Sequence, residues 1–180
     1  MYFLEDDVVG LRPLSVSVSD VGDEYIGWLN DKVTCEGNSH CKLPYTKEQA
    51  EKYIEGMRNS KDDLVLAIID KESVVHIGNA SLQGISWLNR SAEFAILIGS
   101  KNHRGKGVGF RVARLLFGHG FKQLNLHRIY CGTYDNNNAM KKIASRMNMK
   151  ECGVMREAAF KNGQYLDVVM YDLLDSEYYR

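Results

Sequence analysis

The sequence lacks the features that mark several classes of protein. Lys plus Arg and Asp plus Glu number 23 each among its 180 residues, so no net charge favours nucleic acid or a membrane surface as a partner. No apolar segment reaches the roughly 18–20 residues that a membrane-spanning helix needs. The opening residues, Met1 to Asp7, turn acidic at once and do not resemble a signal peptide. These absences predict a cytoplasmic protein that binds neither nucleic acid nor membranes.

Cysteine is scarce and irregularly spaced. The four cysteines, at positions 35, 41, 131 and 152, form no C-x-x-C pair. His40 and Cys41 beside Cys35 resemble half of a zinc site, but the sequence offers no matching second half, so we expect no metal. In a reducing cytoplasm, all four cysteines are expected to be free thiols.

The hydrophobic pattern predicts a mixed α/β fold. Strands are expected over 8–14, 64–70, 74–86, 92–98, 127–134, 154–160 and 165–174, and helices before 31, after 46, from 110 and after 138. The order is β-α-α-β-β-β-α-β-α-β-β, which indicates one mixed sheet with helices on both faces. We find no repeat, linker or low-complexity segment, so residues 1–180 are expected to form one domain.

Three local sequence signals predict where some of these elements begin or end. Asp20 is suited to cap the first helix. Thr46 followed by Gln49 has the spacing of a capping box at the start of the second helix. Asn162-Gly163, between two strand-like runs, is the strongest short-range signal for a β-hairpin.

A glycine-rich segment between an expected strand and an expected helix carries the clearest functional signal. Glycines at 105, 107 and 109 allow a sharp turn that presents backbone N–H groups. A helix that begins there adds free N–H groups and the positive end of its dipole, which suits a phosphate. The spacing matches neither the dinucleotide-binding fingerprint nor the ATPase P-loop. An ordinary strand-to-helix turn is the alternative interpretation.

The segment from Arg104 to Gly109 resembles the R/Q-x-x-G-x-G/A acyl-CoA loop of the GNAT family of N-acetyltransferases. The likeness extends along nearly the whole chain, in the same element order. Ala92-Glu93, the run from Leu124 to Ile129, and the run from Met155 to Asp167 are similar to the branch that acts on ribosomal-protein N-termini, polyamines and activated amino sugars. Residues 28–31 resemble the opening helix of members that serve surface-sugar biosynthesis.

One departure from the family has a simple physical interpretation. The family usually has Gly-Phe where this chain has Asn148-Met149. Asn is the non-glycine residue best able to adopt a left-handed helix cap, and Met can fill the pocket of the aromatic ring. We expect the fold to keep its shape there.

The resemblance implies that acetyl-CoA is the cosubstrate and that particular residues bind it. Pantetheine is expected alongside Leu97 and Ile98, where a bulge splays two parallel strands, and Gly99 is compatible with its close approach. Asn137 is expected both to contact coenzyme A and to cap a helix. The pyrophosphate is expected on the loop residues Arg104, Gly105, Lys106, Gly107, Val108, Gly109 and Phe110.

Two residues are expected to act in catalysis. Glu93 is implied as the general base, directly or through water, because it shares a strand face with Leu97; a solvated charge at a strand end is the alternative. Tyr134 is the nearest hydroxyl for protonating the leaving thiolate, since relatives carry Ser or Tyr where this chain has Met140 and Ala144. A buried aromatic is the alternative interpretation of Tyr134. A thiol with a pKa of about 8.5 leaves without much assistance, so a dedicated acid is dispensable.

The resemblance therefore predicts direct transfer of an acetyl group to a primary amine in a ternary complex. A nucleotide-activated amino sugar is the favoured acceptor, because the expected acceptor loop, residues 33–45, holds Glu36 alone against His40 and Lys42, with Tyr45 for stacking. A polyamine would call for clustered carboxylates. A protein N-terminus is the second candidate, and a non-catalytic acyl-CoA-binding module is the alternative from another class. The oligomeric state stays open, with a dimer compatible.

Overall fold

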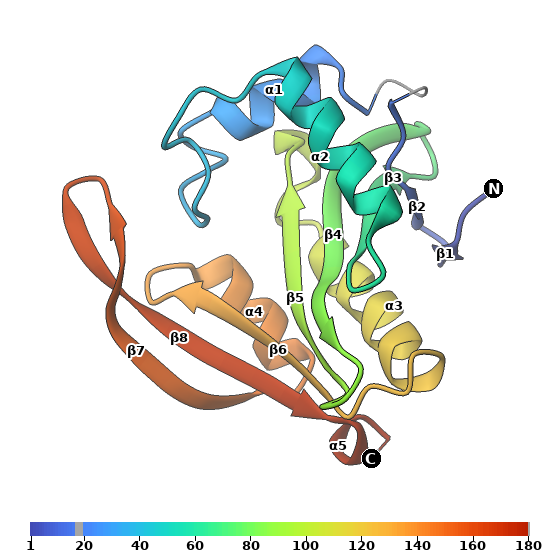
Figure 1. The fold of residues 1–180 in the computed structure, drawn as a ribbon, viewed down its shortest axis with the longest axis vertical. Coiled ribbons are helices and arrows are strands. Elements are labelled where there is room, and N and C mark those ends of the chain that lie inside the picture. Colours follow the sequence, from blue (N-terminus) through green and yellow to red (C-terminus); the bar gives the residue numbers. More distant parts are fainter. Residues whose placement is uncertain (17–19, 180) are drawn as a thin grey trace.

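An eight-stranded mixed sheet runs through the molecule in the order β1-β2-β3-β4-β5-β6-β8-β7 (Figure 1). The computed structural model describes residues 1–16 and 20–179. β6 is parallel to β5 and antiparallel to β8, and the other neighbouring strands pair antiparallel. The strands are β1 (Leu4–Glu5), β2 (Val9–Pro13), β3 (Leu64–Asp70), β4 (Val75–Ser86), β5 (Ser91–Ile98), β6 (Arg128–Tyr134), β7 (Lys150–Lys161) and β8 (Gln164–Leu174).

Helices cover both faces of this sheet because successive side chains of a strand point to opposite sides. In β3, Leu66 and Ile68 belong to one apolar core with α3 (Val108–Lys122) and α4 (Asn138–Arg146). Ala67 and Ile69 belong to a second core with α1 (Asp23–Asn30) and α2 (Lys47–Asn59). A short 3-10 helix (Lys101–His103) precedes α3, and α5 (Asp175–Tyr178) follows β8.

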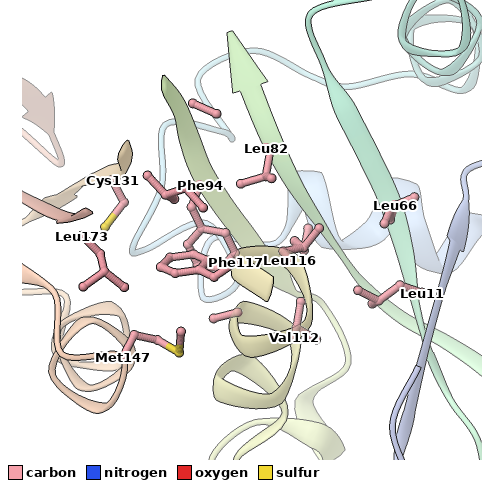
Figure 2. Close-up of a cluster of buried hydrophobic side chains, with 14 of the residues drawn as sticks. Leu11, Leu66, Leu82, Phe94, Val112, Leu116, Phe117, Cys131, Met147 and Leu173 are labelled. Atoms are coloured by element: carbon pink, nitrogen blue, oxygen red, sulfur yellow. The ribbon is translucent and has the colours of Figure 1, made fainter. Parts of the chain in front are cut away.

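The larger core lies between the sheet and α3. Figure 2 shows Phe94 of β5 and Phe117 of α3 at its centre, and their rings meet edge to face with centroids 5.1 Å apart. Full burial of each such side chain contributes about 1.5–3 kcal/mol. This packing fixes α3, and with it the glycine loop that precedes the helix.

The predicted element order is confirmed, with β1 and α5 as additions. The Thr46–Gln49 capping box is present, and Asn162 and Gly163 both have positive φ, at 51° and 81°, as a type I′ hairpin turn requires. The prediction that Asp20 caps the first helix is wrong. α1 begins at Asp23, and its N-cap residue is Gly22, which has no side chain to cap the helix. The Asp20 carboxylate pairs with Arg12 instead.

Candidate active site

A cleft of about 1300 Å³ opens where β5 and β6 separate. The two parallel strands pair from Ser91 and Arg128 as far as Glu93 and Tyr130, and then β5 stays with β4 while β6 follows β8 (Figure 1). The separation therefore begins before Leu97 and Ile98, where a bulge was expected. Among the described residues, the register shifts between paired strands lie elsewhere, in β3–β4, β4–β5 and β7–β8. Leu97 and Ile98 nevertheless line the cleft.

The glycine loop forms one end of this cleft and has the shape of an anion cradle. Gly105 and Gly107 have φ of 74° and 81°, values that residues other than glycine rarely adopt. A Cβ atom at Gly105 would meet nothing within 4 Å, and one at Gly107 would meet only Arg146, at 3.8 Å. The loop backbone therefore faces open space in front of the α3 N-terminus, which fits the pyrophosphate of acetyl-CoA.

Gly109 is a glycine for a different reason. Its ideal Cβ would lie 2.7 Å from Cδ1 of Ile143, so the close contact between α3 and α4 excludes a side chain. Gly99 likewise makes room for a side chain of the protein. The indole of Trp28 fills the space that a Cβ at Gly99 would need, so the packing of α1 explains this glycine, and the approach of pantetheine at Gly99 stays a prediction.

Arg104 ties the glycine loop to the end of β5. Its Nε donates to the Ile98 carbonyl at 2.9 Å, and its Nη2 donates to the Gly99 carbonyl at 3.0 Å and to Thr34 Oγ1 at 2.8 Å. These bonds direct much of the guanidinium toward the protein. A role for Arg104 toward phosphate stays a prediction.

Arg146 is a cation beside the loop that sequence reasoning missed. Its guanidinium lies 3.8 Å from the centroid of the Phe110 ring, and it lines the cleft together with Lys142. The sequence held a signal for this pair, because Lys142 and Arg146 are four residues apart on α4 and so share a helix face. That helix follows the glycine loop in the β-α-β crossover. An adjoining hollow of about 430 Å³ is lined by cationic side chains: Lys106, Arg111, Arg114 and Arg146.

Glu93 lies half-buried in the wall of the cleft, on the strand face that also carries Leu97. Within residues 1–16 and 20–179, the carboxylate has no hydrogen-bond or ion-pair partner, and its cross-strand neighbour Gln83 donates to Ser81 Oγ at 2.8 Å instead. Burial raises the pKa of Glu93. An unpaired carboxylate with a raised pKa is suited to accept a proton.

Tyr134 and Asn137 lie at the opposite wall, where β6 ends. Tyr134 is 8% exposed, and burial raises the pKa of its hydroxyl. Asn137 caps α4 as expected, because its Oδ1 accepts from the Met140 N–H at 3.1 Å, while its Nδ2 donates to the Gly37 carbonyl at 3.1 Å. The cleft thus brings Glu93 and Tyr134 together with every predicted loop residue except Lys106, which lines the adjoining hollow.

The loop between α1 and α2 forms the rim of the cleft and contains a disulfide. Cys35 and Cys41 are bonded, with Cα atoms 6.1 Å apart, while Cys131 and Cys152 are free. The expectation of four free thiols is therefore wrong for the first pair, because turns within residues 36–40 bring the two ends of that segment together. The Lys161 ammonium, at the end of β7, donates hydrogen bonds to the carbonyls of Cys35, Asn38 and His40, which holds the disulfide-closed segment in place.

The two ends of the cleft differ in charge. Its carboxylates are Glu36 and Glu93, both on the side of β5 and the α1–α2 loop, while its Lys and Arg side chains gather near the glycine loop and α4. Desolvation by the loop, together with the Lys161 ammonium, lowers the pKa of His40, so the ring is neutral at pH 7. On the side opposite the glycine loop, the charged lining residues are therefore the two carboxylates, and the Lys161 ammonium lies on the loop that carries Glu36.

Over residues 1–16 and 20–179, no helix is long and apolar enough to cross a membrane. No group of three or more His, Cys, Asp or Glu side chains in the same ranges is arranged to hold a metal ion.

Comparison with known proteins identifies the fold and its chemistry. Residues 9–150 match the family model described as the acetyltransferase (GNAT) domain. An uncharacterised N-acetyltransferase of Bacillus licheniformis, p20, is 30% identical over 175 residues and 93% of both chains. Spermidine N(1)-acetyltransferase of Vibrio cholerae is 34% identical over 102 residues, which are 57% of this chain and 58% of that protein.

A solved structure extends the second likeness to the whole chain. The crystal structure of spermidine N-acetyltransferase from Vibrio cholerae, in complex with CoA and spermine, superposes with a TM-score of 0.84 at 25% identity. The match covers 96% of this chain and 98% of that one. The relatives do not single out the ribosomal-protein or amino-sugar branch that the sequence suggested. The cleft, its phosphate cradle and these matches agree that the chain belongs to the GNAT family and is an acetyl-CoA-dependent N-acetyltransferase.

Proposed function

We propose that the protein transfers the acetyl group of acetyl-CoA to a primary amine of a polyamine such as spermidine. The observation that carries this proposal is the Glu93 carboxylate, unpaired among the described residues, in the wall of the cleft on the side where the α1–α2 loop contributes Glu36 to the lining. A polyamine presents one amine to be acetylated and further ammonium groups along an alkyl chain. Two carboxylates placed along the cleft, with the tyrosine rings of Tyr25, Tyr45 and Tyr53 between the helices and the sheet, suit that pattern of charge.

This acceptor replaces the amino sugar that the sequence favoured. That expectation counted His40 and Lys42 as cations for a diphosphate. His40 is neutral at pH 7, because its pKa is lowered, and Lys42 does not line the cleft. The relatives with named acceptors, spermidine acetyltransferases, give further support to a polyamine.

The proposed reaction is direct attack in a ternary complex. Bound acetyl-CoA supplies the acetyl group as a thioester; the acceptor nitrogen bonds to the acetyl carbon, the carbon–sulfur bond breaks, and the amine loses a proton. Glu93 takes that proton, directly or through one water. A backbone N–H at Leu97 or Ile98 donates to the carbonyl oxygen as negative charge develops on it.

The other residues bind and orient. The N–H groups from Lys106 to Phe110 hold the pyrophosphate, with Arg146 and Lys142 adding positive charge beside them. Tyr134 lines the cleft where β6 ends and is the hydroxyl proposed to return a proton to the thiolate. Asn137 holds the α4 N-terminus and the Gly37 carbonyl in place, beside the proposed coenzyme A site.

The experiment measures release of free thiol from acetyl-CoA with spermidine and with a monoamine of similar chain length. We expect spermidine to be the better substrate, and Glu36→Gln to lower kcat/KM for spermidine by up to roughly fivefold, the effect of about 1 kcal/mol at the upper end for an exposed ion pair. Glu36→Gln should leave kcat/KM for the monoamine unchanged. Thiol release with spermidine no faster than with acetyl-CoA alone would contradict the proposal.

A further inference from the structure

Lys161 joins the loop between α1 and α2 to the β7–β8 hairpin. We call residues 34–41 of that loop the strap, which contains the ring closed by Cys35–Cys41. Lys161 Nζ donates to the carbonyls of Cys35, Asn38 and His40, at 2.8, 2.9 and 3.4 Å. An ammonium has three N–H groups, so the strap accepts all of them. The strap residues that line the cleft are Thr34, Glu36, Gly37, Asn38, Ser39 and His40.

The hairpin presents Lys161 from a fixed position. Lys161 is the last residue of β7 and pairs with Gln164 of β8 across the Asn162-Gly163 turn. β8 in turn pairs along β6, which ends in the wall of the cleft. The side chain of Lys161 is half-buried. The ammonium is therefore an anchor for the strap rather than a freely moving surface charge.

Two further bonds tie the strap to opposite sides of the cleft. On the side of β5, Thr34 Oγ1 accepts from Nη2 of Arg104 at 2.8 Å, and the same guanidinium is bound to the Ile98 carbonyl. At the start of α4, the Gly37 carbonyl accepts from Asn137 Nδ2 at 3.1 Å. An ideal Cβ at Gly37 would lie 2.6 Å from that nitrogen, so the strap lies directly against Asn137. Figure 1 shows the α1–α2 loop reaching from the helices toward α4.

These attachments hold the backbone of Glu36 from both sides. The residue before it, Cys35, is held by the disulfide and by Lys161. The residue after it, Gly37, is held by Asn137. The Glu36 side chain itself is exposed and lines the cleft. A carboxylate on a fixed backbone loses less freedom when it binds an ammonium group than one on a mobile loop.

We propose that Lys161 is a positioning residue: by holding the strap it sets Glu36 for a second ammonium group of the acceptor, and so favours polyamines over monoamines. The inference deepens the proposed function and rests on its acceptor. Lys161 touches neither substrate in this account, because its N–H groups are bound to the strap. Its charge alone would repel a cationic acceptor, so its effect through the strap has the opposite sign to its effect as a charge.

The test compares Lys161→Met with the parent on spermidine and on a monoamine of similar chain length. Met keeps an apolar stem but has no N–H donor. Lys150→Met is the matched control, because it makes the same substitution on the same strand, at an exposed lysine whose ammonium pairs with Glu177. The quantities measured are kcat and KM for each amine, KM for acetyl-CoA, and melting temperature. A readout independent of acetylation is the rate at which dithiothreitol reduces Cys35–Cys41, followed by alkylation and mass spectrometry.

We expect Lys161→Met to raise the KM for spermidine about fivefold, because the freedom that a lysine side chain loses offsets part of its three hydrogen bonds. The kcat, the KM for acetyl-CoA and the KM for the monoamine should stay within about twofold. Adding Glu36→Gln should leave the combined effect near about fivefold, because both changes remove the same contact. Dithiothreitol should reduce the disulfide about fivefold faster, because the strap opens more often. Lys150→Met should match the parent throughout.

The inference is overturned if the KM for spermidine in Lys161→Met is unchanged or lower, if the KM for the monoamine or acetyl-CoA rises in step, or if the double variant shows multiplied effects. Should Lys161→Met fail to fold, Lys161→Gln is measured with the same expectations. A parent that acetylates an amino sugar or a peptide but no polyamine would refute the proposed function. That failure is distinguishable, because an unaltered rate of disulfide reduction in Lys161→Met would refute the hold of Lys161 on the strap whichever amine reacts.

Discussion

Replacing Glu93 with Gln tests the proposed base, and the structure sets the size of the expected effect. The carboxylate is half-buried in the cleft wall and unpaired within the described ranges, and burial raises its pKa. Gln keeps the shape of the side chain but cannot accept the proton. A general base contributes about 10²–10⁴-fold, so turnover at neutral pH should fall by about that factor while acetyl-CoA binding stays within a few fold.

The pH dependence makes this prediction specific. A primary amine with a pKa of about 10.4 is neutral in about one molecule in a thousand at pH 7.4 and about one in ten at pH 9.4. Without a base, the variant depends on that neutral fraction, so its rate should rise about tenfold per pH unit over this range. The parent needs ionised Glu93, so its rate should fall as pH drops through the raised pKa. The deficit of the variant should therefore shrink toward pH 9.4.

Thiol release measured from pH 6 to pH 9.5 provides the assay. Glu55→Gln is the matched control, because it makes the same substitution at an exposed position on α2, and its profile should follow that of the parent. Turnover of Glu93→Gln within about twofold of the parent across the whole range would refute the reasoning and assign the base to another group.

Three further predictions concern the cosubstrate site and the rim. Acetyl-CoA at about 100 times its Kd should stabilise the parent by about 2.7 kcal/mol, seen as a rise in melting temperature. Gly107→Leu should abolish that rise, and Gly56→Leu on α2 should keep it. An unchanged rise in Gly107→Leu would place the phosphate cradle elsewhere. Arg146→Ala should weaken acetyl-CoA binding about tenfold by calorimetry, and an unaltered Kd would refute its role. Reducing Cys35–Cys41 should lower the free energy of unfolding by about 2 kcal/mol, from the short loop that it closes; identical urea midpoints with and without reductant would contradict the bond.

The parts of the fold that sequence predicted are those governed by local chemistry. Asn162-Gly163 makes its turn because both residues tolerate positive φ. Asn148 has φ of 57° and Met149 is 8% exposed, as the departure from the family pattern led us to expect. The two turns need only the residue itself and its chain neighbours.

The features that were missed depend on contacts between distant segments. Asp20 has the right chemistry for a helix cap, but Arg12 and His76 compete for the same carboxylate. Position 99 is a glycine because the indole of Trp28, from α1, occupies the space of a Cβ there. The residue spacing near Gly99 does not predict this contact. The position of Arg146 over Phe110 depends on how α4 packs on α3. Pattern reasoning predicted the turn and the helix start at the glycine loop and missed the side chains that other elements bring to it.

The most direct test of the central claim is competition among acceptors. Equal concentrations of spermidine, a nucleotide-linked amino sugar and a short peptide with a free N-terminus are incubated with the protein and acetyl-CoA, and the products are identified by mass spectrometry. The account predicts acetylated spermidine as the main product, and its loss in Glu93→Gln at neutral pH. Acetylated sugar or peptide, with spermidine left unmodified, would contradict it.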